Sequence, residues 1–204
     1  MKLHWSPRSP FVRQVMIVIH ELGLTDRIEY TRSVVAMTRP NIPLMADNPL
    51  SKIPTLVLAD GEVLYDSRVI SEYLCSCCDD RKLFPADAAR FTALRRHALG
   101  DGLLDLLVLW RNEYLRPENA RSQPLIDAFE LKYAAVMKRL EAEADAFAAT
   151  GFSIGDIAIG CALSYLDFRF GHLHWREQCP RLAVWHAAFE ARPSVMATAI
   201  IDDS

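Results

Sequence analysis

A serine at the start of an amphipathic helix is the first candidate for chemistry. Ser9 precedes Pro10, and apolar residues recur from Phe11 onward, so Ser9 is predicted to be the N-cap of a helix. The third helical residue is Val12 rather than Glu or Gln, so no reciprocal capping box forms and amides of the first turn stay available. An exposed hydroxyl beside the positive end of a helix dipole can hold an anion. The alternative for Ser9 is an ordinary structural cap.

A proline immediately before a predicted strand marks a second candidate. Pro54 lacks an amide hydrogen, which confines it to a sheet edge or to the first residue of a strand. If the Ile53–Pro54 bond is cis, the chain turns sharply and leaves the backbone N–H and C=O of Ile53 unpaired. Those two groups could then pair with an extended peptide, as an added strand does.

An acidic residue and a serine open a later helix. Asp66 and Ser67 precede an apolar stripe of helical spacing. Ser67 and the free amides of that helix can take a carboxylate, and Asp66 can take an ammonium group. An ordinary N-cap is the alternative interpretation of this pair.

The chain holds one further helix start, which we interpret as structural. Ser153 is followed three residues later by Asp156, with Phe152 and Ile157 placed for a hydrophobic staple. The pattern predicts a capping box at the start of a buried helix rather than a site.

These motifs lie on elements that change character near the middle of the chain. The first half alternates strands with helices, and an Asp60-Gly61 hairpin joins two of the strands. The predicted strands are 2–5, 28–35, 55–58 and 62–65, with helices over 10–22 (ended by Gly23) and from 67, and a short helical turn within 37–49. Beyond a charged linker, only helices are predicted, over 87–112, 124–149, 154–170 and 182–191.

Composition limits the classes of function. The chain has 204 residues and a net charge of −3, which gives no reason to expect binding to nucleic acid or an anionic membrane. A signal peptide and a spanning segment are both lacking, so a cytoplasmic location is expected. The five cysteines are an odd, crowded set that predicts reduced thiols, and Cys75, Cys77 and Cys78 lack the second ligand pair of a zinc site.

Three stretches together resemble the glutathione S-transferase superfamily, in its serine-type bacterial members. They are Ser9-Pro10-Phe11-Val12-Arg13, Asn48 to Leu56, and Asp66 to Leu74, and the element order also agrees. The resemblance implies an α/β plus all-α fold: a thioredoxin-like domain over 1–78 that binds glutathione, a linker over 79–86, and an all-helical domain over 87–204. It further implies a homodimer, a small electrophilic substrate, a role in detoxification and no metal.

The resemblance also assigns roles to single residues. Ser9 matches the serine that hydrogen-bonds the glutathione sulfur, and Phe11 follows it within the same motif. Ile53, beside Pro54, matches the residue whose backbone pairs with the cysteinyl part of the tripeptide. Asp66 and Ser67 match the pair that holds the γ-glutamyl end, and Lys52 is expected near the glycyl carboxylate.

The chemistry expected of Ser9 is donation, not proton abstraction. A thiol loses its proton more readily beside donors and helix N-termini, whereas a serine hydroxyl is too weak an acid to serve as the base. Arg13, one turn on, either adds positive potential or forms a surface salt bridge. Trp5 and Ser6 stand where tyrosine-type members carry tyrosine, so Ser6 is a fallback for the sulfur contact. Because Ser9 is not a cysteine, disulfide exchange is disfavoured.

The helical half offers a weaker candidate pocket. Asp101, Leu104, Val108 and Arg111 share one helix face by their spacing. This face either lines the electrophile pocket, with Arg111 holding an anionic substrate, or is a core stripe, which we favour for the two aliphatic residues. In the family, an acid at the position of Asp101 can reach across a dimer interface.

The leading hypothesis is a glutathione transferase in which Ser9 stabilises the attacking thiolate. One alternative is a binding or regulatory protein that keeps the fold without turnover. Another is a glutathione-dependent isomerase or dehalogenase. The sequence does not identify the electrophile.

Overall fold

The structure is a computed structural model that describes residues 1–78 and 83–203. The chain divides into two compact units, one formed by residues 1–85 with 193–204 and the other by residues 86–192. The predicted linker over 79–86 lies partly outside the described residues. The succession of an α/β unit and an all-helical unit confirms the predicted fold class.

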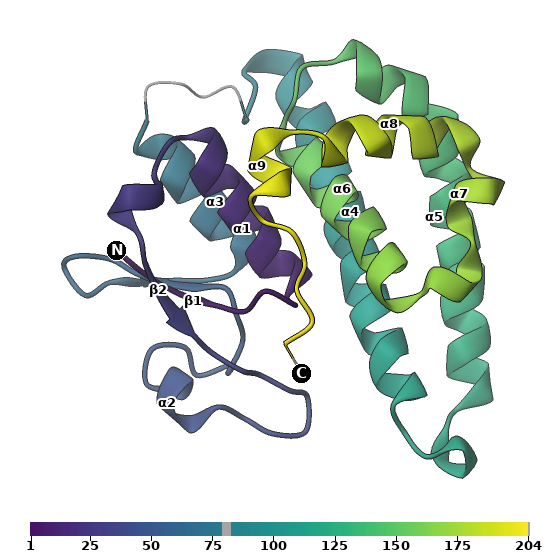
Figure 1. Ribbon diagram of the computed structural model, residues 1–204, viewed down its shortest axis with the longest axis horizontal. Helices are drawn as coiled ribbons and strands as arrows, with labels where there is room; N and C mark the ends of the chain where they lie inside the picture. Colours follow the sequence, from purple (N-terminus) through teal and green to yellow (C-terminus); the bar gives the residue numbers. More distant parts are fainter. Residues whose placement is uncertain (79–82, 204) are drawn as a thin grey trace. The chain divides into compact units, whose positions relative to one another are not determined.

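The first unit is built on a mixed four-stranded sheet in the order β2-β1-β3-β4 (Figure 1). β1 is parallel to β2, and β3 is antiparallel to both of its neighbours. α1 and α3 pack against each other beside the sheet. The bounds are β1 Lys2–Trp5, α1 Pro10–Glu21, η1 Thr25–Arg27, β2 Glu29–Arg32, α2 Ile42–Met45, β3 Thr55–Val57, β4 Val63–Leu64 and α3 Ser67–Ser76.

Local signals set the ends of α1 as predicted. Ser9 is its N-cap and Pro10 its first residue. At the other end, Gly23 adopts a φ of 65° and donates to His20 O, while Leu24 donates to Ile19 O across 2.9 Å. These two bonds make a Schellman motif, which requires a left-handed residue and therefore favours glycine.

The last residues of the chain correct one predicted boundary. The sequence placed all of 87–204 in the helical domain, whereas residues 193–204 group with the first unit. The reason is that α9, Pro193–Met196, packs on α1. Ser194 Oγ donates to Glu21 Oε1 across 2.5 Å, and Arg13 Nη2 donates to Val195 O across 3.4 Å.

The second unit consists of helices around an apolar core. Its longest helices are α4 and α5, and α4 crosses α6 so closely that a Cβ on Gly100 would lie 2.6 Å from the Ala158 backbone. Trp110 is fully buried and its ring lies 5.2 Å from that of Phe170. The bounds are α4 Asp87–Tyr114, η2 Glu118–Ala120, α5 Gln123–Ala149, α6 Ile154–Arg169, η3 Gly171–Leu173, α7 Trp175–Gln178 and α8 Pro180–Glu190.

The helix start at Ser153 is the predicted capping box. The Asp156 carboxylate accepts from the Ser153 backbone N–H across 3.0 Å and from its hydroxyl across 2.5 Å. Burial raises the pKa of Asp156. Among the described helices, none combines the length and apolar character needed to cross a membrane.

Candidate functional site

The sheet register brings the three predicted motifs to one end of the first unit. His4 pairs with Thr55 in the antiparallel β1–β3 ladder, so Ile53 lies level with the loop that follows β1. Leu56 pairs with Leu64, which places Asp66 at the same end of the sheet. The start of α1 at Ser9 follows directly from that loop. Backbone and side-chain donors from all three motifs therefore face one region at the carboxyl end of β1.

The Ser9 hydroxyl is positioned as a donor. Its oxygen accepts from Val12 N across 3.3 Å, and Ser9 N donates to Ser6 O across 3.2 Å. A serine hydroxyl has one proton and two lone pairs, so the cap uses a lone pair and leaves the proton for another acceptor. The Ser9 residue is half-buried, so part of it is open to solvent.

Phe11 contributes through its backbone. Its N–H has no hydrogen-bond partner within the described residues, and Pro10 before it has no N–H to offer. The first turn of α1 thus presents one unpaired amide next to the Ser9 hydroxyl, at the positive end of the helix dipole.

Ser6 is less accessible than Ser9. Its side chain is buried, and its hydroxyl oxygen accepts from Arg8 N across 3.4 Å. This contact serves the turn between β1 and α1. Ser6 remains a predicted fallback for the sulfur contact.

The Ile53–Pro54 bond is cis, the condition that the sequence analysis set for an unpaired strand edge. The Ile53 side chain packs with Val12 of α1 and Leu44 of α2, while its backbone makes no hydrogen bond to any described residue. Ile53 is thereby held in place with its N–H and C=O unused. Lys52, just before it, has an exposed side chain.

Asn48 has a role that the sequence analysis missed. Its buried amide donates to Lys52 O across 3.1 Å and to Thr55 Oγ1 across 2.9 Å, and its Oδ1 accepts from Leu50 N across 3.0 Å. These bonds fix the loop that presents Ile53. The signal was present in the sequence, because an Asx residue two positions before its backbone donor is typical of a turn.

Asp66 and Ser67 occupy the start of α3 as predicted. Asp66 is exposed and is the N-cap, with its carboxylate accepting from Arg68 N across 3.0 Å. Ser67 is almost fully buried, and its backbone N–H has no partner in the described chain. The second oxygen of Asp66 stays available to a cation, and the first turn of α3 to an anion.

Arg13 is buried, so the predicted surface salt bridge at this residue is wrong. Its side chain is buried, its Nη2 donates to Val195 O, and its Nε has no partner within the described residues. Arg13 therefore fastens the C-terminal segment to α1. A contact between residues so distant in sequence leaves no local signal, which is why the sequence suggested the surface instead.

The four helical candidates differ in burial. Leu104 is fully buried, while Val108 and Arg111 are half-buried. The Arg111 charge lies near Tyr165, whose pKa is raised by burial. Asp101 is buried within the second unit, with its Oδ2 3.3 Å from His97 Nε2, so its carboxylate has a partner on its own helix. Their roles in an electrophile pocket remain predictions.

A serine, a histidine and an aspartate also meet in the first unit. Ser33 Oγ lies 2.9 Å from His4 Nδ1, and His4 Nε2 lies 2.8 Å from Asp47 Oδ2. Hydrogen bonds from Lys2 first, and then from His4, lower the pKa of Asp47. The order of groups is that of a hydrolase triad, but Ser33 is buried at 5% exposure, which denies a substrate access to the hydroxyl. These contacts connect β1 to the residue that follows β2 and to the segment that follows α2.

A second cluster offers ligand atoms for a metal but already holds a cation. Asp167, His186 and Glu190 bring theirs within 4.8 Å of one another. Arg176 Nη2 lies 2.6 Å from Asp167 Oδ2 and 3.0 Å from His186 Nδ1. Burial lowers the pKa of His186, so its neutral ring accepts from the guanidinium. The ligand atoms of this cluster are therefore occupied by the Arg176 guanidinium rather than by a metal.

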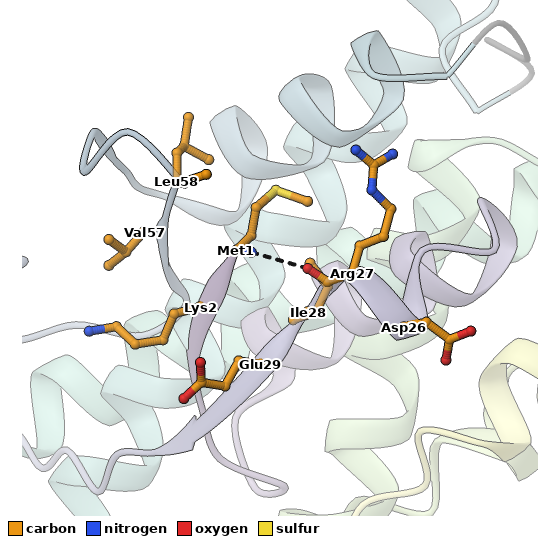
Figure 2. A pocket seen from close by; sticks show the side chains of 9 residues that line it. Met1, Lys2, Asp26, Arg27, Ile28, Glu29, Val57 and Leu58 are labelled. Carbon is orange, nitrogen blue, oxygen red and sulfur yellow. Dashed lines mark hydrogen bonds between the residues drawn. The ribbon is translucent and has the colours of Figure 1, made fainter.

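The hollow drawn in Figure 2 lies at the opposite end of the sheet from Ser9. It is lined by residues that open β1 and β2 and close β3, including Lys2, Glu29 and Val57. The Met1 amino group donates to Arg27 O across 3.1 Å beside it (Figure 2). None of the predicted site residues lines this hollow.

The comparisons with known proteins agree with this arrangement. Residues 8–77 match the family model for the N-terminal domain of glutathione S-transferase, and residues 123–188 match the model for its C-terminal domain. The chain is 31% identical over 191 residues to the uncharacterized GST-like protein YibF of Escherichia coli strain K12, covering 89% of this chain and 90% of that protein.

Two solved structures of a glutathione transferase family member from Pseudomonas fluorescens Pf-5 are also similar. One, with bound glutathione, is 42% identical with a TM-score of 0.94, and 98% of each chain is covered. The other, with bound S-(propanoic acid)-glutathione, is 40% identical with a TM-score of 0.90 and the same coverage.

Proposed function

Because the chain belongs to the glutathione S-transferase family, we propose that it binds glutathione at the carboxyl end of β1 and transfers the tripeptide to a small electrophile. The observation that carries this proposal is the state of Ser9. Its hydroxyl caps α1 through a lone pair and keeps its proton for an incoming anion.

The proposed chemistry is nucleophilic attack by a stabilised thiolate. The Ser9 hydroxyl and the Phe11 N–H donate to the sulfur, and the α1 dipole adds a favourable potential, so the thiol pKa falls below its ordinary value of about 8.5. The thiol proton leaves to solvent, since Ser9 cannot hold it. The sulfur then attacks the electrophilic carbon of the second substrate.

The rest of the tripeptide is assigned to the neighbouring motifs. The unpaired Ile53 backbone takes the cysteinyl part as an added strand would, beside Pro54. Asp66 takes the γ-glutamyl ammonium, and Ser67 at the start of α3 takes its carboxylate. Exposed Lys52 supplies a cation for the glycyl carboxylate.

Two bound ligands in relatives support the proposal. Glutathione binds to one similar structure, and S-(propanoic acid)-glutathione to another, in which the sulfur carries a carboxylate-bearing substituent. We extend both to this chain as a co-substrate and as the kind of thioether it would form. A homodimer and a role in detoxification belong to the same proposal.

The test measures the thiolate directly. Mixing the protein with glutathione at neutral pH should produce the ultraviolet absorbance of a bound thiolate, and Ser9→Ala should abolish it. Conjugation of a panel of small electrophiles should slow by roughly a hundredfold in that variant, the cost of removing one donor to a developing anion. Ser76→Ala, at an exposed serine whose hydroxyl bonds Tyr73 O, is the matched control and should change neither.

The result also separates the enzyme from a binding protein. Glutathione affinity with no thiolate absorbance and no turnover would contradict the transferase and favour the regulatory alternative. An absorbance that persists in Ser9→Ala but disappears in Ser6→Ala would move the sulfur contact to Ser6.

A further inference from the structure

Two arginines hold a single carboxylate next to Ser9. Arg8 Nε lies 2.8 Å from Asp203 Oδ1, and Arg32 Nε lies 2.9 Å from Asp203 Oδ2, with Arg32 Nη2 on the same oxygen. Each arginine thus takes one carboxylate oxygen. The two arginines come from separate segments and both donate to one carboxylate, which is the arrangement that binds a carboxylate well.

The position of the arginines follows from the sheet. Arg32 ends β2 and pairs in register with Trp5, the last residue of the parallel strand β1. Arg8 lies in the loop after β1 and immediately precedes Ser9. The Cα atoms of Arg8 and Ser9 are therefore about 3.8 Å apart. Both guanidinium groups therefore lie at the carboxyl end of β1 and β2, where the glutathione sulfur is proposed to bind.

The carboxylate arrives on the C-terminal segment. α9 is fastened to α1 by Arg13 and Ser194, and Ser194, Val195 and Thr198 are buried. Beyond Thr198 the chain is largely exposed, with Ile201 at 61%, until Asp203 meets the arginines. Figure 1 shows this segment running along α1. The tail is thus anchored at α9, and its distal part bears the carboxylate.

The energetics allow this carboxylate to be displaced. A hydrogen bond from Arg32, with the charges of Arg32 and Arg8, holds the pKa of Asp203 below its usual range, so it is ionised at neutral pH. Between a quarter and a third of each side chain in the group is exposed to solvent, and partly exposed ion pairs contribute little to stability. Two adjacent guanidinium groups favour an anion between them, and here that anion is the Asp203 carboxylate.

We propose that Arg8 and Arg32 form the subsite for a carboxylate on the electrophile, that Asp203 occupies this subsite in the free protein, and that the substrate class is α,β-unsaturated carboxylates. This inference rests on the proposed function, because it places the electrophile against the thiolate held by Ser9. It adds the substrate class and a competing group built into the chain.

The reaction balances with this assignment. The thiolate forms a C–S bond to the β-carbon, and the π electrons of the carbon–carbon double bond move to the α-carbon. That carbon takes one proton from water, which replaces the proton released from the thiol. Nothing is oxidised or lost, and the product is a thioether that keeps the carboxylate. The two guanidinium groups stabilise the charge that develops next to the carboxylate during attack.

Calorimetric titration with two thioethers tests the subsite without requiring turnover. S-(2-carboxyethyl)glutathione carries the carboxylate, and S-(2-carbamoylethyl)glutathione replaces it with a neutral amide of the same shape. The wild-type protein should bind the carboxylate thioether more tightly. Arg8→Gln and Arg32→Gln should each weaken that binding by roughly tenfold, with the amide thioether unchanged.

Removing the charge of Asp203 should have the opposite effect on binding of the carboxylate thioether. Asp203→Asn should strengthen binding of the carboxylate thioether several-fold, because the competing anion is removed, and should leave the amide thioether unchanged. Arg27→Gln is the matched control. Arg27 ends η1 and lines the hollow of Figure 2, at the other end of β2 from Arg32, so it should affect neither ligand.

The outcomes that overturn the inference are distinct from failure of the proposed function. Equal binding of the two thioethers in the wild type, or an equal loss for both in Arg8→Gln, would overturn the carboxylate subsite while the transferase stands. Weaker binding of both thioethers in Asp203→Asn would show that the tail builds the pocket and would overturn the competition. Failure of glutathione itself to bind would overturn the proposed function.

Discussion

The two units each begin a helix with a serine cap, and the two caps differ in what they leave available. At α1, Ser9 faces Val12 at the third helical position, so its oxygen accepts one amide and its proton stays uncommitted. At α6, Ser153 faces Asp156, which accepts both the hydroxyl and the backbone N–H of the serine. The first cap is half-buried and open, and the second is buried and closed.

The difference shows that the residue three positions on decides what a capping serine can do. An acid at that position accepts the hydrogen bonds that the serine can donate, so the cap has only a structural role. An apolar residue there joins the core instead, as Val12 does with Leu44 and Ile53, and leaves the serine proton and a first-turn amide for a ligand. The two serines also differ in burial, since Ser9 is half-buried and Ser153 is buried.

The largest effect should come from opening the closed cap. Asp156→Ala leaves the Ser153 hydroxyl and N–H buried without an acceptor, and the free energy of unfolding should fall by about 3 kcal/mol. Ser9→Ala, the matched change at the open cap, should cost about 1 kcal/mol or less. Equilibrium urea unfolding followed by tryptophan fluorescence and circular dichroism measures both. Similar losses at the two caps would contradict the comparison.

A smaller effect should follow from a change at Gly155, the second residue of α6 after the closed cap. A Cβ on Gly155 would lie 2.6 Å from Arg96 Cβ and 2.7 Å from Ala93 O, because α6 meets α4 there. Gly155→Ala should therefore destabilise the helical unit by about 2 kcal/mol. The control is Gly102→Ala, where a Cβ meets nothing within 4 Å, and this change should stabilise α4 by about 0.5–1 kcal/mol. Thermal unfolding of both variants gives the sign of each.

Local patterns predicted the parts of the fold that local physics determines. The left-handed Gly23, the Asp60-Gly61 hairpin and the capping box at Ser153 all depend on a few adjacent residues, and the structure confirms each. The short helices α7 and α9 were missed. Pro193 at the first position of α9 was an available signal, because proline favours the first turn of a helix.

Contacts between distant residues were beyond sequence reasoning. The buried Arg13 donates to the carbonyl of Val195, and Arg8 pairs with the carboxylate of Asp203. No spacing in the sequence indicates that the last residues return to the first helix. From their own patterns Ser9, Ile53 and Asp66 were three separate candidates, which only the family resemblance joined. The register of the sheet shows directly that they lie at one end of it.

The smallest expected effect is a dependence on pH that only the closed cap should show. Burial raises the pKa of Asp156 in the folded protein, so the folded state holds this proton more tightly than the unfolded state. The stability that this gives is complete below the unfolded pKa of about 3.9 and is lost as the pH rises through the folded value. The stability difference between the wild type and Asp156→Asn should therefore shift against the wild type as the pH rises through that range.

The open cap supplies the control for this titration. Neither Ser9 nor Val12 titrates, so the stability difference between the wild type and Ser9→Ala should stay constant over the same pH range. Urea unfolding of the three proteins at a series of pH values gives both differences. A flat difference for Asp156→Asn would mean that the carboxyl at α6 is as well solvated as an exposed one, and the contrast between the caps would then rest on the third helical residue alone.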